Sequence, residues 1–516
     1  MADKLSPRGL GPGAHRAVIT LCVMLATIMQ ALDTTIANVS LPYMQGTMAA
    51  SQDQINWVLT SYIVAAAIMT PPTGWLAGRF GRKRLLLVAV VGFAATSALC
   101  GSASSLTEIV LYRLLQGGFG AALVPMSQAV LLSSYPRERH GSAMALWGVG
   151  VMLGPILGPA LGGWLTENYS WRWVFYINVP VAVLAVVGIS TFMRETARER
   201  SRFGWFGFLL LSLAIGALQL LLDRGEELDW FGSREIVVLA VVAAVAFYMF
   251  LVHMFMAERP FLSPAVFADR NFLAGVTLIF VLGIVLFTTL ALLAPFLQTM
   301  MNYPVLSAGL LLAPRGIGTM LAMLAVGRLV GKFDTRALVL FGLALTAWAL
   351  YQMTGWTPAV SAATVVVTGI VQGCGFGFIF VPLSAMVFST LSAARIPEAA
   401  GVYNLMRNIG SSIGISLSMA FLVGNTQANH AEIGAGVIAA NPLFRAPAIA
   451  HFWSPLTAQG RALLDAEITR QATTIAYIDD FKLLTIIALL SMPLVLLLRQ
   501  PRAAAPAGAL AQAASE

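Results

Sequence analysis

Residues 74–80 read Gly74-Trp75-Leu76-Ala77-Gly78-Arg79-Phe80, and residues 327–333 read Gly327-Arg328-Leu329-Val330-Gly331-Lys332-Phe333. Both stretches fit the pattern G-x-L-x-G-(R/K)-F. A second pair of matches has a similar offset of about 255 residues: Gln116-Gly117 precedes Pro125-Met126-Ser127, and Gln372-Gly373 precedes Pro382-Leu383-Ser384. Two matches at one offset indicate that the chain consists of two related halves.

The composition around these repeats is that of a membrane protein. Of the 516 residues, 58% are hydrophobic and only 10% are charged, with a mean hydropathy of +0.80. A soluble domain carries about 25% charged residues. The cysteines Cys22, Cys100 and Cys374 fall in apolar stretches without metal-ligand spacing, so we interpret them as packing residues and expect no metal site.

About fourteen segments are long and apolar enough to cross a bilayer, which takes about 20 residues. They run roughly over 17–39, 55–77, 85–104, 108–132, 142–164, 173–193, 206–223, 235–256, 272–298, 307–330, 337–354, 360–391, 399–424 and 481–499. The first of them lacks a small-residue cleavage site, so we do not interpret it as a cleavable signal peptide.

The basic residues orient these spans. With the N-terminus inside, 21 of the 31 lysines and arginines fall on the cytoplasmic side and 7 on the opposite side. This bias predicts that both termini lie in the cytoplasm. It also accounts for the net charge of +8 without nucleic-acid binding.

The repeat maps the second span onto the tenth and the fourth onto the twelfth. We therefore expect an all-α integral membrane protein with two six-helix halves and two inserted helices between them, the arrangement of alternating-access transporters. The expected parts are a cytoplasmic tail (1–16), an N-terminal half (17–202), the inserted helices (203–258), a C-terminal half (259–499) with an outer loop (425–480), and a second cytoplasmic tail (500–516).

Asp33 lies inside the first span, where a carboxylate costs roughly 3 kcal/mol or more and commonly marks a proton or ion path. The alternative is a helix cap at the outer end. Arg113 in the fourth span has a similar depth, so we expect the two to pair. Protonation of Asp33 would then release Arg113. A static structural salt bridge is the alternative.

Two further stretches are candidates for moving parts. The fifth span carries Gly154, Pro155, Gly158 and Gly162 in a run of small and helix-breaking residues, which suits a close and pliable interface between the halves or simply tight packing. The loop after the second span has a near-copy after the tenth, which favours a gating latch over a topology determinant alone. Its candidate gating residues are Gly74, Gly78, Arg79, Gly81 and Arg82.

Four polar residues in or near apolar helices complete the candidate set: Asn38, Gln116, Asn404 and Arg407. Such groups either bind substrate or bridge neighbouring helices.

The same residues resemble the fourteen-helix drug:proton antiporters of the major facilitator superfamily, the EmrB/QacA type, over nearly the whole chain. The similar stretches are Leu32–Pro42 in the first span, the loop Gly74–Arg84, Arg113 with Gln116-Gly117, Leu153–Gly163 in the fifth span and Trp171–Pro180 at the sixth. The resemblance implies the major facilitator fold, proton coupling through Asp33 and export rather than import. The chain departs from the family pattern at Gly78, where an aspartate is usual.

We therefore expect a proton-coupled exporter of small amphipathic or toxic compounds in a bacterial-type inner membrane, without a cofactor. The resemblance also implies a periplasmic adaptor as a partner, and residues 461–480, an expected amphipathic helix on the outer face, are one place for it to dock; a simple cover over the outer cavity is the alternative. The alternatives for the function are a facilitator or importer of one solute, and a membrane-embedded enzyme. No HExxH, GxSxG or phosphate-loop motif supports an enzyme.

Overall fold

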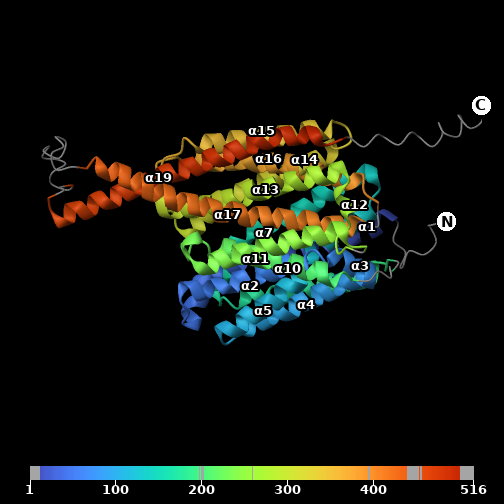
Figure 1. The fold of residues 1–516 in the computed structure, drawn as a ribbon. Coiled ribbons are helices and arrows are strands. Elements are labelled where there is room, and N and C mark those ends of the chain that lie inside the picture. Colours follow the sequence, from blue (N-terminus) through green and yellow to red (C-terminus); the bar gives the residue numbers. More distant parts are fainter. Residues whose placement is uncertain are drawn as a thin grey trace, which may run out of the picture.

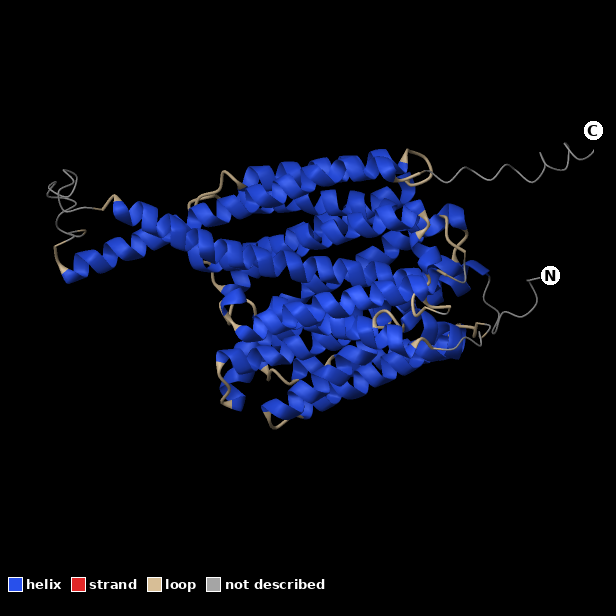
Figure 2. Cartoon of the chain, viewed as in Figure 1, coloured by secondary structure: helices blue, strands red, loops and turns tan. Residues whose placement is uncertain are grey.

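The computed structural model describes residues 12–437, 453 and 456–499, apart from 197, 199–202, 259, 393 and 394. Long helices run side by side through this part of the chain, and it contains no strand (Figure 2). The prediction of an all-α protein is confirmed.

The first nine helices form the N-terminal half, and Figure 1 places most of them in the lower part of the bundle. They are α1 (Pro12–Met48), α2 (Gln52–Met69), α3 (Thr73–Phe80), α4 (Arg82–Ser102), α5 (Leu106–Gly120), α6 (Leu123–Ser134), α7 (His140–Asn168), α8 (Trp173–Tyr176) and α9 (Asn178–Phe192).

The inserted helices are α10 (Trp205–Arg224) and α11 (Arg234–Met256). The C-terminal half follows with α12 (Pro264–Phe267), α13 (Arg270–Pro295), α14 (Val305–Leu329), α15 (Thr335–Met353), α16 (Ala362–Ser389), α17 (Ile396–Ala435) and α19 (Ala458–Ser491). Short helical turns η1 (Arg137–Arg139), η2 (Trp230–Gly232), η3 (Phe296–Met300) and η5 (Met492–Leu497) complete the described elements.

Among the described residues, thirteen helices are long and apolar enough to cross a membrane, and the bent pair Gln54–Met69 and Thr73–Phe80 makes a fourteenth span. The two parts of that pair meet at 58°. Pro71 and Pro72 lie in the break, and proline interrupts a helix because it has no amide hydrogen and its ring clashes with the preceding turn. The span expected at 55–77 is therefore present, but it is broken.

The inserted helices contact both halves through α10. The hydroxyl of Thr60 on α2 donates to the Asp223 carboxylate, and the hydroxyl of Ser416 on α17 donates to the carbonyl of Leu222 at 2.6 Å. Helices α10, α11, α12, α13 and α17 also line an open apolar pocket of about 750 Å³, with residues such as Phe250 and Leu405 in its wall. Its lining is almost free of polar groups, so this cavity is not the place for a charged site.

We call the end of the bundle with α3 and α12 the basic end, because the arginine-rich loops lie there (Figure 1). The two halves touch closely at this end. The hydroxyl of Ser142 on α7 donates to the carbonyl of Gly327 on α14 at 3.1 Å. A Cβ on Gly74 would lie only 2.6 Å from the Cα of Glu398 on α17, so glycine is what permits the contact. The halves are thus closed against each other at the basic end.

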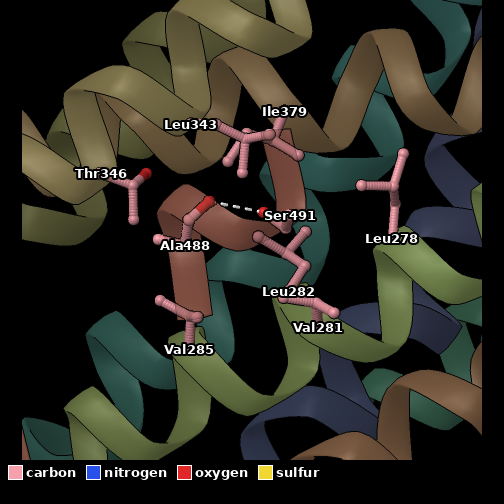
Figure 3. A pocket seen from close by; sticks show the side chains of 9 residues that line it. All are labelled: Leu278, Val281, Leu282, Val285, Leu343, Thr346, Ile379, Ala488 and Ser491. Atoms are coloured by element: carbon pink, nitrogen blue, oxygen red, sulfur yellow. Dashed lines mark hydrogen bonds between the residues drawn. The ribbon is translucent and has the colours of Figure 1, made fainter. Parts of the chain in front are cut away.

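The interior of the C-terminal half is packed tightly. Helices α13, α15, α16 and α19 meet around an apolar space of about 10 Å³, and Figure 3 shows the side chains that line it. The only hydrogen bond drawn there joins the hydroxyl of Ser491 to the carbonyl of Ala488 within α19 at 2.7 Å. A space of this size holds one water molecule at most, so it is a packing defect and not a substrate site.

At the opposite end, α17 and α19 project beyond the other helices as a hairpin (Figure 1). His430 on α17 contacts Asp465 on α19 at 3.1 Å. The helix expected over residues 461–480 is present as the first part of α19, which continues without a break into the last span. Its beginning projects with α17 instead of lying flat on the outer face, whereas Tyr477 near its end packs on Phe296 of the bundle. Residues 438–452, 454 and 455 of the expected outer loop lie outside the described residues.

Candidate functional site

Asp33 and Arg113 form a salt bridge deep inside the N-terminal half. Nη1 of Arg113 on α5 donates to Oδ2 of Asp33 on α1 at 2.6 Å, and both side chains are only 1% exposed. Their similar depth in the sequence predicted this contact. Two charges withdrawn so far from solvent stay ionised at low cost only when they are paired and hydrogen-bonded.

The second carboxylate oxygen of Asp33 accepts two hydrogen bonds. Oδ1 accepts from Nε2 of Gln116 at 2.9 Å and from Nδ2 of Asn178 at 3.0 Å. Asn178 also donates to the hydroxyl of Ser97 at 3.0 Å. The Asp33 carboxylate therefore joins α1 to α5 and α9, and Asn178 extends the network to α4.

Arg113 has contacts on every side. Its Nη1 also donates to Oε1 of Gln116 at 2.8 Å, and its Nε donates to the carbonyl of Val58 on α2 at 3.1 Å. The guanidinium lies 4.3 Å from the ring centroid of Tyr62 and 5.6 Å from that of Phe175. These aromatic faces favour the cation and shield it from water.

This arrangement can link one proton to the packing of several helices. When Asp33 binds a proton, it loses the charge that strengthens its bonds to Arg113, Gln116 and Asn178, because charge-assisted hydrogen bonds are roughly twice as strong as neutral ones. The helices that these side chains join are then free to take another arrangement.

The glycines of α7 lie against α1 beside this cluster. A Cβ on Gly154 would collide with the carbonyl of Ala31, and a Cβ on Gly158 would collide with the side chain of Thr35. The Thr35 hydroxyl donates to the carbonyl of Gly154 at 3.0 Å. Gly162 approaches α1 in the same way at Ile36. Pro155 lies between these glycines within the helix.

The helix that carries these glycines lies between the halves as expected, but Gly154, Gly158 and Gly162 face α1 within their own half. They let α7 contact the segment of α1 that carries Asp33. Another face of α7 meets the other half, where Trp147 stacks on Phe380 of α16 with ring centroids 5.6 Å apart and Ile156 packs against Gly316 of α14.

Comparison with known proteins decides the family. The sequence profile of the Major Facilitator Superfamily matches residues 23–415. The chain belongs to the major facilitator superfamily. The EmrB/QacA-type assignment that its motifs indicated is confirmed, and the transporter is a multi-pass membrane protein.

Two curated relatives cover most of the transporter. It is 37% identical over 433 residues to "Multidrug export protein EmrB" of Escherichia coli (strain K12), which covers 83% of this chain and 85% of the relative. It is 34% identical over 493 residues to "Fatty acid resistance protein FarB" of Neisseria gonorrhoeae, which covers 95% and 97%.

A solved structure shares the fold. The proton:xylose symporter XylE superposes with a TM-score of 0.60 at 15% identity, over 92% of this chain and 95% of the symporter.

The arginine-rich loop between α3 and α4 is held by residues that follow α9. Gly78 and Arg79 lie in α3, and the chain turns at Gly81, whose φ is +92°. The Glu195 carboxylate covers Gly81 and accepts the backbone N–H groups of Lys83 and Arg84 at 3.2 Å each, at the start of α4. The backbone N–H of Arg82 donates to the hydroxyl of Thr196. An acid from beyond α9 therefore caps the helix that follows the loop.

The three remaining polar candidates differ in burial and in their contacts. Asn404 on α17 is buried and donates from Nδ2 to Oε1 of Gln128 on α6 at 3.0 Å, which makes it a bridge between the halves. Asn38 is exposed on α1. Arg407 is half-buried, and its Nη2 donates to Oδ1 of Asn408 at 3.4 Å.

Three members of the Asp33 cluster were missed from the sequence: Ser97, Tyr62 and Asn178. Asn178 lies in the Trp171–Pro180 stretch, which we interpreted only as a family motif. An asparagine two residues before a proline in an otherwise apolar span was the available signal.

Proposed function

We propose that this transporter exports small amphipathic compounds in exchange for protons by alternating access, with its basic end in the cytoplasm of a bacterial inner membrane. The observation that carries the proposal is the Asp33–Arg113 pair, because a buried and fully bonded carboxylate inside a membrane helix marks a proton path. The names of EmrB and FarB, which speak of drug export and fatty acid resistance, support export as the direction.

Asp33→Asn tests the coupling, because asparagine keeps the shape of the side chain and removes the charge. Purified protein in liposomes with a proton gradient should accumulate a fluorescent amphipathic probe such as 12-(NBD-amino)dodecanoic acid. We expect Asp33→Asn to fall to the level of protein-free liposomes. Asp229→Asn, an exposed position between α10 and α11, is the matched control and should keep wild-type uptake. Full proton-driven uptake by Asp33→Asn would overturn the coupling role.

The proposed orientation has its own test. Cys22 and Cys100 are buried and Cys374 is half-buried, so engineered surface cysteines dominate labelling. Arg84→Cys at the basic end and Tyr169→Cys at the opposite end are both exposed positions. In intact cells, a membrane-impermeant maleimide should label only Tyr169→Cys. Labelling of Arg84→Cys alone would reverse the orientation.

We also propose that the α17–α19 hairpin meets a periplasmic adaptor protein. Its projection beyond the other helices supports this, because it offers a surface that no other described helix covers at its tip (Figure 1). A hairpin shortened at both arms should lose export from cells and keep proton-driven uptake in liposomes. Loss of both activities would instead assign the hairpin to the transport cycle itself.

A further inference from the structure

The C-terminal half contains a counterpart of the Asp33 cluster. Gln372 on α16 is the repeat-related partner of Gln116, and its Nε2 lies 3.4 Å from the hydroxyl of Thr289 on α13. In the N-terminal half, Gln116 donates in the same way to Asp33 on α1. In both halves, a glutamine on the fourth span therefore bonds a polar side chain on the first, but the C-terminal half has threonine in place of the acid.

An arginine enters the C-terminal cluster from a different helix. Nη2 of Arg315 on α14 donates to the carbonyl of Leu286 at 3.3 Å, and its guanidinium lies 5.2 Å from the ring centroid of Phe376. Leu286 is three residues before Thr289 on α13, and Phe376 is four residues after Gln372 on α16. Since α13 and α16 run in opposite directions, both offsets point toward the basic end. The guanidinium thus lies about one helical turn from the Gln372–Thr289 pair.

Unlike Arg113, this arginine has no acidic partner within the described part of the chain. Arg315 is 4% exposed, and its Nη1 is buried without a hydrogen-bond acceptor. Oε1 of Gln372 is buried and unpaired as well. A buried cation without a counter-ion is strongly disfavoured inside a membrane protein, and groups of this kind usually face a ligand or a transport path.

We propose that Arg315 binds the anionic group of the transported compound, and that this group is the carboxylate of an amphipathic acid. A carboxylate oxygen at Nη1 would supply the missing charge, and the planar guanidinium fork suits a carboxylate better than a point charge does. The Nε2 of Gln372 is the second donor. The inference rests on the proposed export function and names its substrate class: weak organic acids with an apolar tail.

The division of labour between the halves follows from this site. The N-terminal cluster already contains its anion, Asp33, and responds to a proton. The C-terminal cluster has no acidic side chain, and the carboxylate of the transported compound supplies its anion. Proton and cargo therefore have separate residues, and removing the cargo charge should leave the proton response intact.

The test compares two probes that differ only in the charge of one group: 12-(NBD-amino)dodecanoic acid and its methyl ester. Their binding to the full chain in lipid nanodiscs is followed by NBD fluorescence. We expect the wild-type protein to bind the acid at least tenfold more tightly than the ester. Arg315→Gln should bring the two affinities together by weakening the acid alone, and Arg315→Lys should keep part of the preference. Arg328→Gln, an exposed position on the same helix, is the matched control and should behave as wild type.

Equal wild-type affinity for acid and ester, or an undiminished preference in Arg315→Gln, would overturn the proposal. Displacement of the acid by chloride or phosphate at equal concentration would also overturn it, because the site would then bind any small anion. Arg315→Lys serves if Arg315→Gln does not fold. Proton-driven uptake of the same two NBD probes into liposomes by the wild-type protein separates the two claims: equal uptake of acid and ester removes only the anion site, whereas absence of uptake of both removes the export function.

Discussion

Gln116 in the N-terminal half shares the carboxylate of Asp33 with Arg113, whereas Gln372 in the C-terminal half reaches Thr289 beside an arginine that has no carboxylate partner among the described residues. A close helix contact at a repeat-related glycine is found in both halves. A Cβ on Gly154 of α7 would collide with the carbonyl of Ala31, and one on Gly410 of α17 would collide with the carbonyl of Phe280. The duplicated fold has kept its helix contacts while its charges have diverged.

This difference indicates that the two halves have diverged in their buried charges and not in their helix packing. Close helix packing depends on small residues whose positions both halves retain. A buried charge depends on one partner, and a single substitution can remove it. The halves are therefore expected to respond alike to changes in packing and differently to changes in charge.

The largest effect should come from breaking the paired charges. Arg113→Gln leaves Asp33 buried without its counter-ion, which is expected to destabilise the protein by about 3–5 kcal/mol. Thermal unfolding in detergent, followed by size-exclusion chromatography, measures the loss. The double variant Asp33→Asn/Arg113→Gln should recover most of the stability and no proton-driven uptake. An unfolding temperature of Arg113→Gln equal to wild type would mean that the pair is not needed for folding.

The packing contacts should behave symmetrically. Gly154→Ala and Gly410→Ala each force a helix pair apart and should each destabilise by about 1–3 kcal/mol. Gly163→Ala is the control, because a Cβ there meets no atom within 4 Å. The same unfolding assay compares the three. A large loss in one half alone would show that the packing has diverged together with the charges.

The charge difference can be reversed at one position. Thr289→Asp places an acid where the N-terminal half has Asp33, next to Arg315. We expect it to reduce the preference for the NBD-labelled acid over its ester by about tenfold, equivalent to about 1.4 kcal/mol. Thr289→Asn has a similar shape without the charge and should keep the preference. Retention of the full preference in Thr289→Asp would contradict the proposed place of the anion.

The smallest effect concerns the two copies of the loop. In the N-terminal half Glu195 caps α4 from a distant part of the chain, whereas in the C-terminal half Asp334 caps α15 locally by accepting the backbone N–H of Arg336 at 2.8 Å. Glu195→Ala and Asp334→Ala should each cost about 1 kcal/mol, as helix caps do. If only Asp334→Ala lowers the unfolding temperature, the distant cap contributes nothing.

The sequence predicted those features that depend on position along one helix. The depth of Asp33 and Arg113 was sufficient to pair them, and the repeat was sufficient to divide the chain into halves. The face that a residue presents was not predictable in this way. Gly154 and Gly158 were expected between the halves because an apolar span shows no periodicity that distinguishes a lipid-facing side from a buried one.

Contacts between distant segments were the other class that the sequence did not reveal. Nothing near Gly81 in the sequence indicates that Glu195 covers it. The two loop copies also end their helices differently, since α3 continues to Phe80 whereas α14 stops at Leu329 and turns at Gly331 with a φ of +92°. A matching motif therefore did not guarantee matching local structure.

The continuous course of α17 has a mechanical consequence. Its 40 residues run from the contact with Gly74 at the basic end, past the bridge at Asn404, to the projecting tip, a length of about 60 Å. A rigid rod of that length that tilts by about 10° around its middle moves each end by about 5 Å in opposite directions. A displacement of the tip would therefore displace the contact with Gly74 at the basic end, and a protein bound to the tip would resist such a tilt.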